Sequence, residues 1–226
     1  METKLRNIIR AQRITERAFD DVLAMVRAGA TERGIADSIR RRAKVRGASG
    51  LAFDPIVAAG AGAAEPHHQP TERRLRAGDL VVIDLGCRYG GYCADMTRTV
   101  AIGRPDAEQR KAYRLVLRAQ EASIRTVRAG ITGRELDATA RDVIARGGYG
   151  KRFVHSLGHG IGRKVHQRPR ISPNRSDRLA AGDVIAVEPG IYVPRRFGIR
   201  IEDMVLVTPH GARNLTRTPK RLVVIQ

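Results

Sequence analysis

Five side chains of the kinds that bind metal ions follow one another along this chain of 226 residues. Four are carboxylates and one is an imidazole, in the order Asp84, Asp95, His159, Glu188 and Glu202. A set dominated by oxygen ligands suits two divalent ions that share carboxylates better than one tetrahedral structural zinc. Because paired metal ions make hydroxide from water at neutral pH, this ordered set predicts metal-assisted hydrolysis.

The first two carboxylates lie on either side of a glycine-rich turn in DLVVIDLGCRYGGYCADMTRT. If the turn is centred on residues 89–90, Asp84 and Asp95 are direct cross-strand partners, with Cβ atoms roughly 4.5–5.5 Å apart. Two carboxylates this close repel each other unless a cation lies between them. The apolar run before Asp84 indicates burial, and a buried carboxylate needs a metal ion or a basic partner. An arginine of the same hairpin, Arg88 or Arg98, is the alternative to a metal ion.

Histidines occur in two loop-like stretches of the sequence. His155, His159 and His166 stand in HSLGHGIGRKVH. A lone histidine is more often structural than a ligand, but glycines on both sides let the backbone turn sharply or pass close to a ligand. In AEPHHQPTERR, His67 or His68 could reach the site from a loop, and exposure of both is the alternative.

The two glutamates follow apolar stretches. Glu188 ends VIAVEPG, where exposure to solvent explains a carboxylate poorly, and Glu202 lies in GIRIEDMVLV. On a strand, Arg200 and Glu202 share one face. An exposed Arg200–Glu202 pair is the alternative to a ligand role for Glu202.

Periodicity predicts the elements that hold these residues. Apolar residues at helical spacing predict helices over 3–28 and 31–46, and again over 105–130 and 132–147. From residue 153 onward the pattern predicts short strands and turns without a long helix. The strands expected earlier in the chain are 55–59, 80–86 and 92–101.

An internal repeat divides the chain. VRAGATERGI at 26–35 matches VRAGITGREL at 127–136, and each copy follows a long helix and begins a shorter one. Chance similarity of two helical turns is the alternative. Otherwise the chain consists of two α/β halves around one central sheet, and a site at their junction draws ligands from both.

Composition places the chain among ordinary globular proteins, with 42% hydrophobic and 29% charged residues. One domain over residues 1–226 is expected.

The sequence has no apolar run of about 18 residues and no signal-peptide pattern, so we expect a cytoplasmic protein without a membrane partner. Cys87 and Cys93 are too few for a disulfide scaffold, and reduced thiols are expected.

The net charge of +19 raises the question of nucleic-acid binding. The basic residues are spread along the whole chain, in stretches such as RRRAKVR, TERRLR and TPKRL. Aromatic residues make up only 4% and there is no tryptophan, so platforms for stacking bases are scarce. A solvated, arginine-rich surface is therefore expected, and a nucleic-acid partner is not.

The order of the five ligands in these frames resembles the metallopeptidases of the pita-bread fold, which include methionine aminopeptidase, prolidase, Xaa-Pro aminopeptidase and creatinase. The resemblance extends from about residue 3 to the C-terminus, and all five positions carry the expected residue type. It implies an α+β fold, with two pseudo-symmetric α/β halves around a curved, mostly antiparallel sheet.

The resemblance also implies the cofactor. Two divalent metal ions are expected, with Mn²⁺ as the usual metal of the family and Co²⁺ or Zn²⁺ as alternatives. By this resemblance Asp84 holds one ion, His159 and Glu188 hold the other, and Asp95 and Glu202 bridge both.

Other residues receive roles through the same resemblance. Glu188 would also move the proton during hydrolysis. His67 and His166 match histidines that contact the substrate near the scissile bond and stabilise the tetrahedral intermediate. His155 and Arg200 would line the substrate pocket.

Within the family, PHHQPT, His155 and the IRIED strand with Arg200 resemble the Xaa-Pro branch. This implies removal of the N-terminal residue from peptides with proline in second position, by a monomer or a homodimer. The pattern departs from that branch in starting at residue 3, without the usual N-terminal creatinase-like domain, a layout typical of methionine aminopeptidase. GAGAAEPHH and Gln167 also depart from the usual pattern near the pocket. Methionine aminopeptidase-like processing and a non-catalytic binding module, for example for nucleic acid, are the alternatives.

Overall fold

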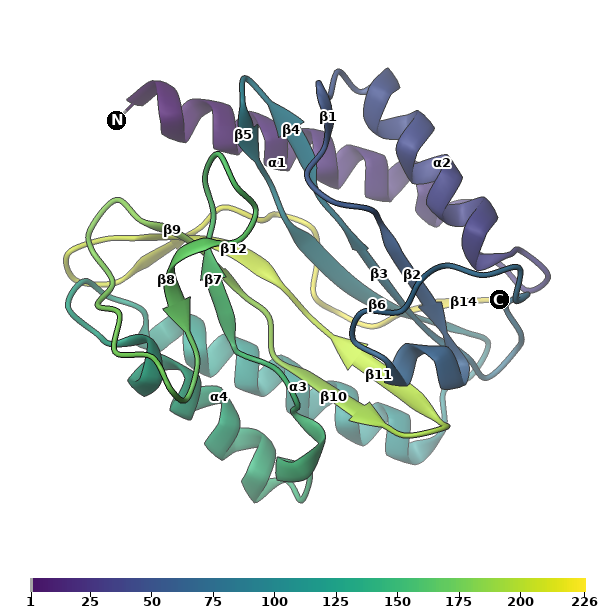
Figure 1. Cartoon of the computed structure of the whole chain (residues 1–226). Helices are drawn as coiled ribbons and strands as arrows, with labels where there is room; N and C mark the ends of the chain where they lie inside the picture. The colour runs from purple at the N-terminus through teal and green to yellow at the C-terminus, as the bar shows by residue number, and fades with distance from the viewer. Residues whose placement is uncertain (1) are drawn as a thin grey trace.

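Four long helices lie on the outside of a curved layer of strands in the computed structural model, which describes residues 2–226 (Figure 1). The first half of the chain contains α1 (Glu2–Leu23), α2 (Glu32–Val45), β1 (Gly50–Leu51), β2 (Ile56–Ala59), the short 3-10 helix η1 (Gly60–Ala64), β3 (Leu80–Leu85), β4 (Cys87–Tyr89), β5 (Tyr92–Cys93) and β6 (Met96–Ile102). The second half contains α3 (Ala107–Thr126), α4 (Gly133–Arg146), η2 (Gly150–Arg152), β7 (Gly158–Gly160), β8 (Gln167–Ile171), β9 (Val184–Val187), β10 (Gly190–Val193), β11 (Phe197–Arg200), β12 (Asp203–Val207), β13 (Ala212–Asn214) and β14 (Val223–Ile225).

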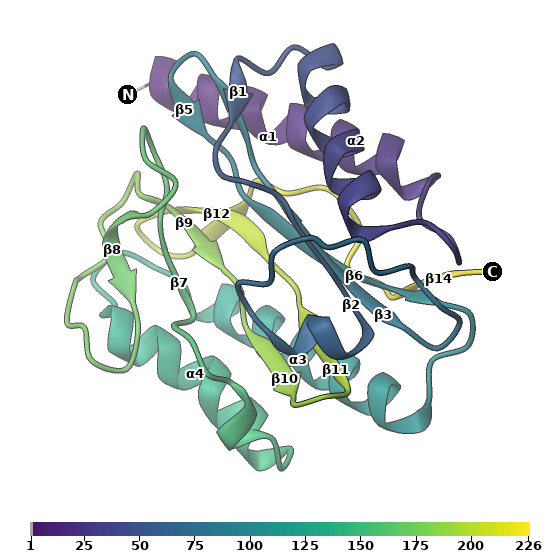
Figure 2. The same cartoon turned by 45° about the vertical axis from the view of Figure 1, so that its right-hand side comes forward.

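The strands pair almost entirely in antiparallel fashion, as expected. A four-stranded sheet has the order β14-β6-β3-β2, and a five-stranded sheet has the order β13-β12-β9-β7-β8. Two smaller sheets, β1-β4-β5 and β10-β11, complete the layer. The pairing of β14 with β6 is parallel. Figure 2 shows α1 and α2 together on one side of the strands and α3 and α4 on the other.

Short polar residues begin three of the helices. The Thr31 side chain accepts a hydrogen bond at the start of α2, and Thr132 forms a capping box with Glu135 at the start of α4. Asp106 caps α3, one residue after the predicted start at Pro105. These side chains satisfy backbone N–H groups that have no partner within the helix.

The first helix ends earlier than predicted, at Leu23 instead of residue 28. Gly29 has a φ of 85°, and its N–H donates to the carbonyl oxygen of Leu75. The chain must leave the helix to make this contact, so a tertiary hydrogen bond overrides the local helical pattern.

The predicted repeat is visible in the backbone hydrogen bonds. The N–H of Gly29 donates to Leu75 and the N–H of Gly130 donates to Leu179. At each glycine, an arginine side chain also donates to the glycine carbonyl oxygen: Arg74 to Gly29 and Arg178 to Gly130. The two halves therefore connect their first and second helices to the sheet in the same way.

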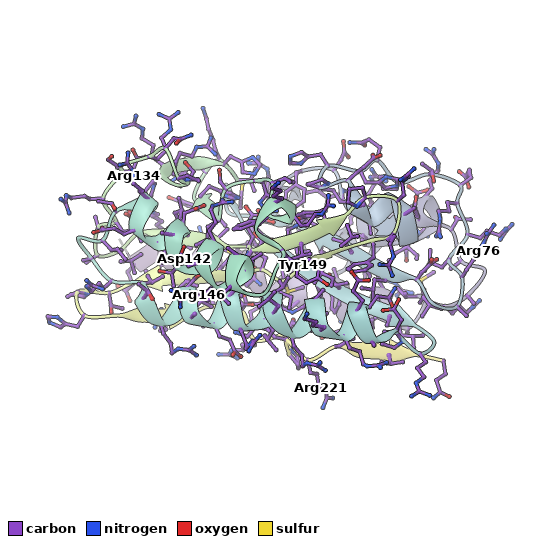
Figure 3. All side chains as sticks on the ribbon, turned by 90° about the horizontal axis from the view of Figure 1, so that it is seen from below. Arg76, Arg134, Asp142, Arg146, Tyr149 and Arg221 are labelled. Atoms are coloured by element: carbon purple, nitrogen blue, oxygen red, sulfur yellow. The ribbon has the colours of Figure 1, made fainter. Side chains whose placement is uncertain are left out.

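Each half has its own hydrophobic core. One cluster of buried residues packs α1 and α2 against β2, β3 and β6, and a second packs α3 and α4 against β9 to β12. Within residues 2–226, no helix combines the length and the apolar character needed to cross a membrane. Arginines are spread over the outer surface, and Arg76, Arg134 and Arg221 lie on separate parts of it (Figure 3).

A buried ion pair joins the two halves. Arg98 of β6 lies 2.8 Å from Asp203 of β12, and both side chains are almost fully buried. Lys220 lies 3.3 Å from the other carboxylate oxygen of Asp203, and Asn214 donates to it at 2.7 Å. Burial raises the pKa of Asp203, but the charges of Arg98 and Lys220 and these hydrogen bonds outweigh it and hold the pKa below its ordinary value.

Replacing Asp203 with asparagine is expected to destabilise the fold by about 3–5 kcal/mol at pH 7, because it leaves Arg98 buried without its counter-charge. The folded pKa of Asp203 lies below the unfolded value of about 3.9. The contribution of this carboxylate is therefore complete above that value and is lost as the pH falls through the folded pKa. Urea unfolding of both proteins from pH 7 to pH 3 should show the difference shrinking at acid pH, and a constant difference would contradict the ion-pair explanation.

Candidate active site

The five predicted ligand residues meet in one cavity of about 520 Å³ between the two halves of the chain. Each stands at or near the end of a strand, where the ladder stops and the side chain can turn into the cavity. Asp84 lies in β3, Asp95 between β5 and β6, His159 in β7, Glu188 directly after β9, and Glu202 between β11 and β12. Both halves therefore contribute, as the repeat predicts.

The predicted register of the first hairpin is wrong. Asp84 is paired with Thr97, not with Asp95. The turn is formed by Gly90 and Gly91, whose φ angles are 55° and 78°, and a two-residue hairpin turn of this kind needs positive φ at both central positions. The glycine pair therefore displaces the predicted register by two residues. Asp95 still reaches the site, because residues two apart point to the same face.

Two overlapping groups of ligand atoms consist entirely of predicted ligands, and a third group contains Asp95, His159 and His166. Asp84, Asp95 and Glu202 offer atoms that all lie within 4.8 Å of one another, and so do His159, Glu188 and Glu202. Glu202 belongs to both groups. Asp95 also lies 3.8 Å from His159 Nε2. This arrangement fits two neighbouring cations that share carboxylate ligands.

Two carboxylate oxygens of the site have no hydrogen-bond partner among residues 2–226. These are Oδ1 of Asp84 and Oε1 of Glu202, and both are buried. A buried polar atom without a partner is costly, and a buried charge still more so. The opposite oxygens are fully engaged, since Arg200 donates to Asp84 and Thr97 donates to Glu202. The residues present therefore fit a divalent metal ion on the unpaired side of each carboxylate.

The electrostatics of the site favour the binding of a cation. Burial raises the pKa of Asp95 well above its ordinary value, and the nearby charges of Glu202 and Asp84 raise it further. Burial has the same first effect on Asp84 and Glu202, whose pKa values are also raised. Burial raises the pKa of Glu188 as well, but a hydrogen bond to His159 and that residue's charge bring it down to about 2. A bound cation reverses such upward shifts.

Three histidines line the cavity beside the ligands: His67, His155 and His166. Burial lowers the pKa of His155, and burial together with the charge of His159 lowers that of His166. Both shifts favour the neutral ring, which can donate one hydrogen bond. The His166 ring lies edge-on to the ring of His159, with centroids 4.3 Å apart.

His68 does not reach the cavity. Its Nε2 lies 2.9 Å from the carboxylate of Glu32 in α2. The two adjacent histidines therefore point to different surroundings, and of the two it is His67 that lines the site.

Arg200 lines the cavity, but its guanidinium group is occupied by protein partners. It donates to Asp84 at 2.6 Å, to the hydroxyl of Tyr192 at 2.9 Å and to the carbonyl oxygen of Pro66 at 3.2 Å. These contacts hold Asp84 and the loop that carries His67. A direct role of Arg200 in substrate binding stays a prediction.

Sequence reasoning missed Tyr192, Phe53 and Ile56. Tyr192 is buried, and its hydroxyl lies 2.8 Å from His155 Nε2 as well as within reach of Arg200. Phe53 and Ile56 form an apolar part of the cavity wall. The only signal for Ile56 was its strand, which pairs with β3 so that Ile56 faces Asp84. No sequence signal distinguished Tyr192 from the other tyrosines.

The chain belongs to a family of metal-dependent peptidases, since the model of metallopeptidase family M24 matches residues 6–209. It is 42% identical to the Xaa-Pro dipeptidase of Pyrococcus horikoshii over 222 residues, and this alignment covers 98% of this chain and 63% of that relative. The Xaa-Pro dipeptidase of Pyrococcus furiosus is 43% identical over 216 residues, 96% of this chain and 62% of the relative. The chain thus spans less than two thirds of the length of these curated relatives.

Solved structures confirm the fold. The X-Pro aminopeptidase of Thermotoga maritima matches with a TM-score of 0.97 and 43% identity, covering 100% of this chain and 64% of that one. The prolidase of Pyrococcus furiosus matches with a TM-score of 0.95 and 42% identity, covering 97% and 65%. The predicted α+β pita-bread fold, with two related halves, is therefore correct, and so is the predicted family.

Proposed function

We propose that this chain is a metal-dependent peptidase that removes the N-terminal residue from peptides with proline in second position. The observation that carries the proposal is the pair of overlapping ligand groups, in which buried oxygens of Asp84 and Glu202 lack partners. Family membership and relatives named Xaa-Pro dipeptidase support the same activity.

In this proposal the five ligands divide between two divalent ions. Asp84 would hold one ion, His159 and Glu188 would hold the other, and Asp95 and Glu202 would be ligands of both. The overlap of the two groups at Glu202 supports this division. When bound, such ions lower the pKa of a water molecule and polarise a carbonyl group.

The other polar groups of the cavity handle the proton and the substrate. Glu188 would take up the proton released by water and pass it to the leaving amine. His67 and His166 donate N–H groups to the carbonyl oxygen of the scissile bond as it gains negative charge. His155, held by the hydroxyl of Tyr192, shapes the wall of the pocket.

The cavity suits a short peptide. Its volume of about 520 Å³ lies within the usual range of ligand sites, roughly 300–1,000 Å³. Phe53, Ile56 and Pro66 supply an apolar surface in the same cavity as the charged ligands, and such a surface is suitable for the ring of proline.

We further propose Mn²⁺ as the metal, because four carboxylates and one imidazole form a mainly hard ligand set. Metal analysis of the purified protein and activity titrations with Mn²⁺, Co²⁺ and Zn²⁺ test this choice. The cytoplasmic location stays a prediction, with which the free thiols of Cys87 and Cys93 are compatible. Whether the chain acts as a monomer or a homodimer is measured by light scattering.

The decisive experiment is hydrolysis of Xaa-Pro, Xaa-Pro-Xaa and Met-Ala-Xaa peptides by chelator-treated protein, with and without Mn²⁺. Metal-dependent cleavage before proline is expected. Cleavage of Met-Ala-Xaa alone would select methionine aminopeptidase-like processing. Metal binding without cleavage of any peptide would contradict the proposal and favour a non-catalytic binding module.

A further inference from the structure

Glu32 is a buried carboxylate outside the cavity that collects an unusual number of donors. It is the first residue of α2, and its relative exposure is 0%. One oxygen accepts the backbone N–H of Ala59 at 2.9 Å. The other accepts both the N–H and the hydroxyl of Thr71, at 3.0 and 2.7 Å, and lies 2.9 Å from Nε2 of His68.

These donors come from both ends of one segment, residues 59–71. Ala59 is the last residue of β2, and Thr71 follows the sequence PHHQP. The segment between them carries His67 and its neighbour Pro66 to the cavity. Glu32 therefore ties the start and the end of the loop to one helix, and through His68 it also ties its middle.

The His68 ring that contacts Glu32 is closely packed on its other side. The ring packs over Gly62 so closely that a Cβ at Gly62 would lie 2.9 Å from Cε1 of His68. Pro66 and His67 lie in a turn that is closed by the His68 N–H, which donates to the carbonyl oxygen of Glu65 at 3.2 Å. Fixing His68 against Glu32 therefore also fixes the turn that carries His67.

The second half of the chain shows that the helix itself does not need this carboxylate. Glu32 N–H donates to the Arg73 carbonyl oxygen, and Gly133 N–H donates to that of Asp177 in the same position of the repeat. At Gly133 there is no room for a side chain, since a Cβ would lie 2.1 Å from the carbonyl oxygen of Arg170. The carboxylate is present only in the half that carries the His67 loop.

We propose that Glu32 is a positioning residue that holds the 59–71 segment in place and thereby keeps His67 directed at the metal ligands. The structural part of this inference stands on the contacts of Glu32 alone. Its effect on turnover rests on the proposed peptidase function.

Glu32→Gln is the test variant. An amide keeps the volume but has one acceptor oxygen, and its NH₂ group faces a donor, so at least one of the four contacts is lost. Hydrogen–deuterium exchange in residues 59–71 is expected to increase. In the Mn²⁺-loaded protein, kcat is expected to fall about 10- to 100-fold, the usual scale for outer-shell residues, with little change in KM or in metal affinity by calorimetry.

Glu16→Gln is the matched control. Glu16 is a buried helical carboxylate that accepts backbone N–H groups of Arg217 and Thr218, and neither of these lines the cavity. This variant is expected to lower the melting temperature without faster exchange in residues 59–71 and without a specific loss of kcat. Thr71→Val removes one donor to Glu32 and should give a smaller effect of the same kind, even if Glu32→Gln folds poorly.

A double-mutant cycle separates positioning from general destabilisation. If Glu32 acts through His67, adding Glu32→Gln to His67→Ala should reduce kcat little further, because the group being positioned is already absent. Fully additive losses, or unchanged exchange in residues 59–71 of Glu32→Gln, would overturn the inference. Should the wild-type chain cleave no peptide, the proposed function fails while the exchange experiment still decides the role of Glu32.

Discussion

Replacing Glu202 with glutamine is expected to abolish peptide hydrolysis and, at the same time, to make the metal-free protein more stable. Glu202 is the residue shared by both ligand groups, so its loss should disturb both ions, and activity should fall by on the order of a thousandfold or more. In the metal-free protein, however, Glu202 is a buried carboxylate near Glu188 and Asp84, and burial and these charges raise its pKa well above the ordinary value.

The sign of the stability effect follows from that raised pKa. A carboxyl group that prefers to be neutral in the fold costs no stability below the unfolded pKa and an increasing amount as the pH rises above it. Glutamine removes this cost and still accepts the hydrogen bond that Thr97 donates. We expect a gain of about 1–2 kcal/mol at pH 8, or roughly 2–8 °C in melting temperature.

Thermal melts in the presence of a chelator, from pH 5 to pH 8, measure this gain. Glu72→Gln is the control, because Glu72 is mostly exposed and outside the cavity, and it should change neither activity nor pH dependence. Normal hydrolysis by Glu202→Gln would contradict the bridging role. A metal-free variant less stable than the wild type would show that the carboxylate cluster is not repulsive.

The second large effect is expected from the metal itself. Chelation should abolish hydrolysis and lower the melting temperature, and added Mn²⁺ should restore both. The reason is that buried oxygens of Asp84 and Glu202 gain a partner only when a cation binds. At a free metal concentration of 100 times Kd, binding stabilises a fold by about 2.7 kcal/mol, which corresponds to roughly 5–11 °C for a chain of this size.

Calorimetric titration of the chelated protein checks the stoichiometry. Two ions are expected for the wild type, and fewer for Glu202→Gln. A melting temperature that no divalent ion changes would exclude this cluster as a metal site. A single tightly bound ion in the wild type would limit the proposal to one of the two ligand groups.

Much of the site could be predicted because its residues stand in recognisable local sequence patterns. Asp84 and Glu188 end buried apolar strands, where a carboxylate has no explanation in solvation, and His159 lies between glycines. The helix starts at Thr31 and Thr132 depend on a few neighbouring residues. Features that depend on only a few neighbouring residues, such as strand ends and helix caps, can be predicted from sequence.

The register of the first hairpin shows where such reasoning fails. The prediction centred the turn on residues 89–90, one residue before the centre of the glycine pair at 90–91. Gly90 and Gly91 alone accept the backbone angles of this turn without a steric cost, and they pair Asp84 with Thr97. Here the information was in the sequence, but the turn chemistry was not recognised.

The sequence by itself determined the candidate metal ligands, the starts of the four long helices and the duplication of the chain, because composition, caps and periodicity act over short distances. Only the tertiary structure decided that Tyr192 links His155 to Arg200 and that Arg200 spans to Asp84. It also decided that Glu32 holds the loop of His67. One of its contacts there is with Ala59, which lies 27 residues further along the sequence. Such contacts depend on how two halves of the chain pack, and packing brings together residues whose separation along the sequence leaves no local trace.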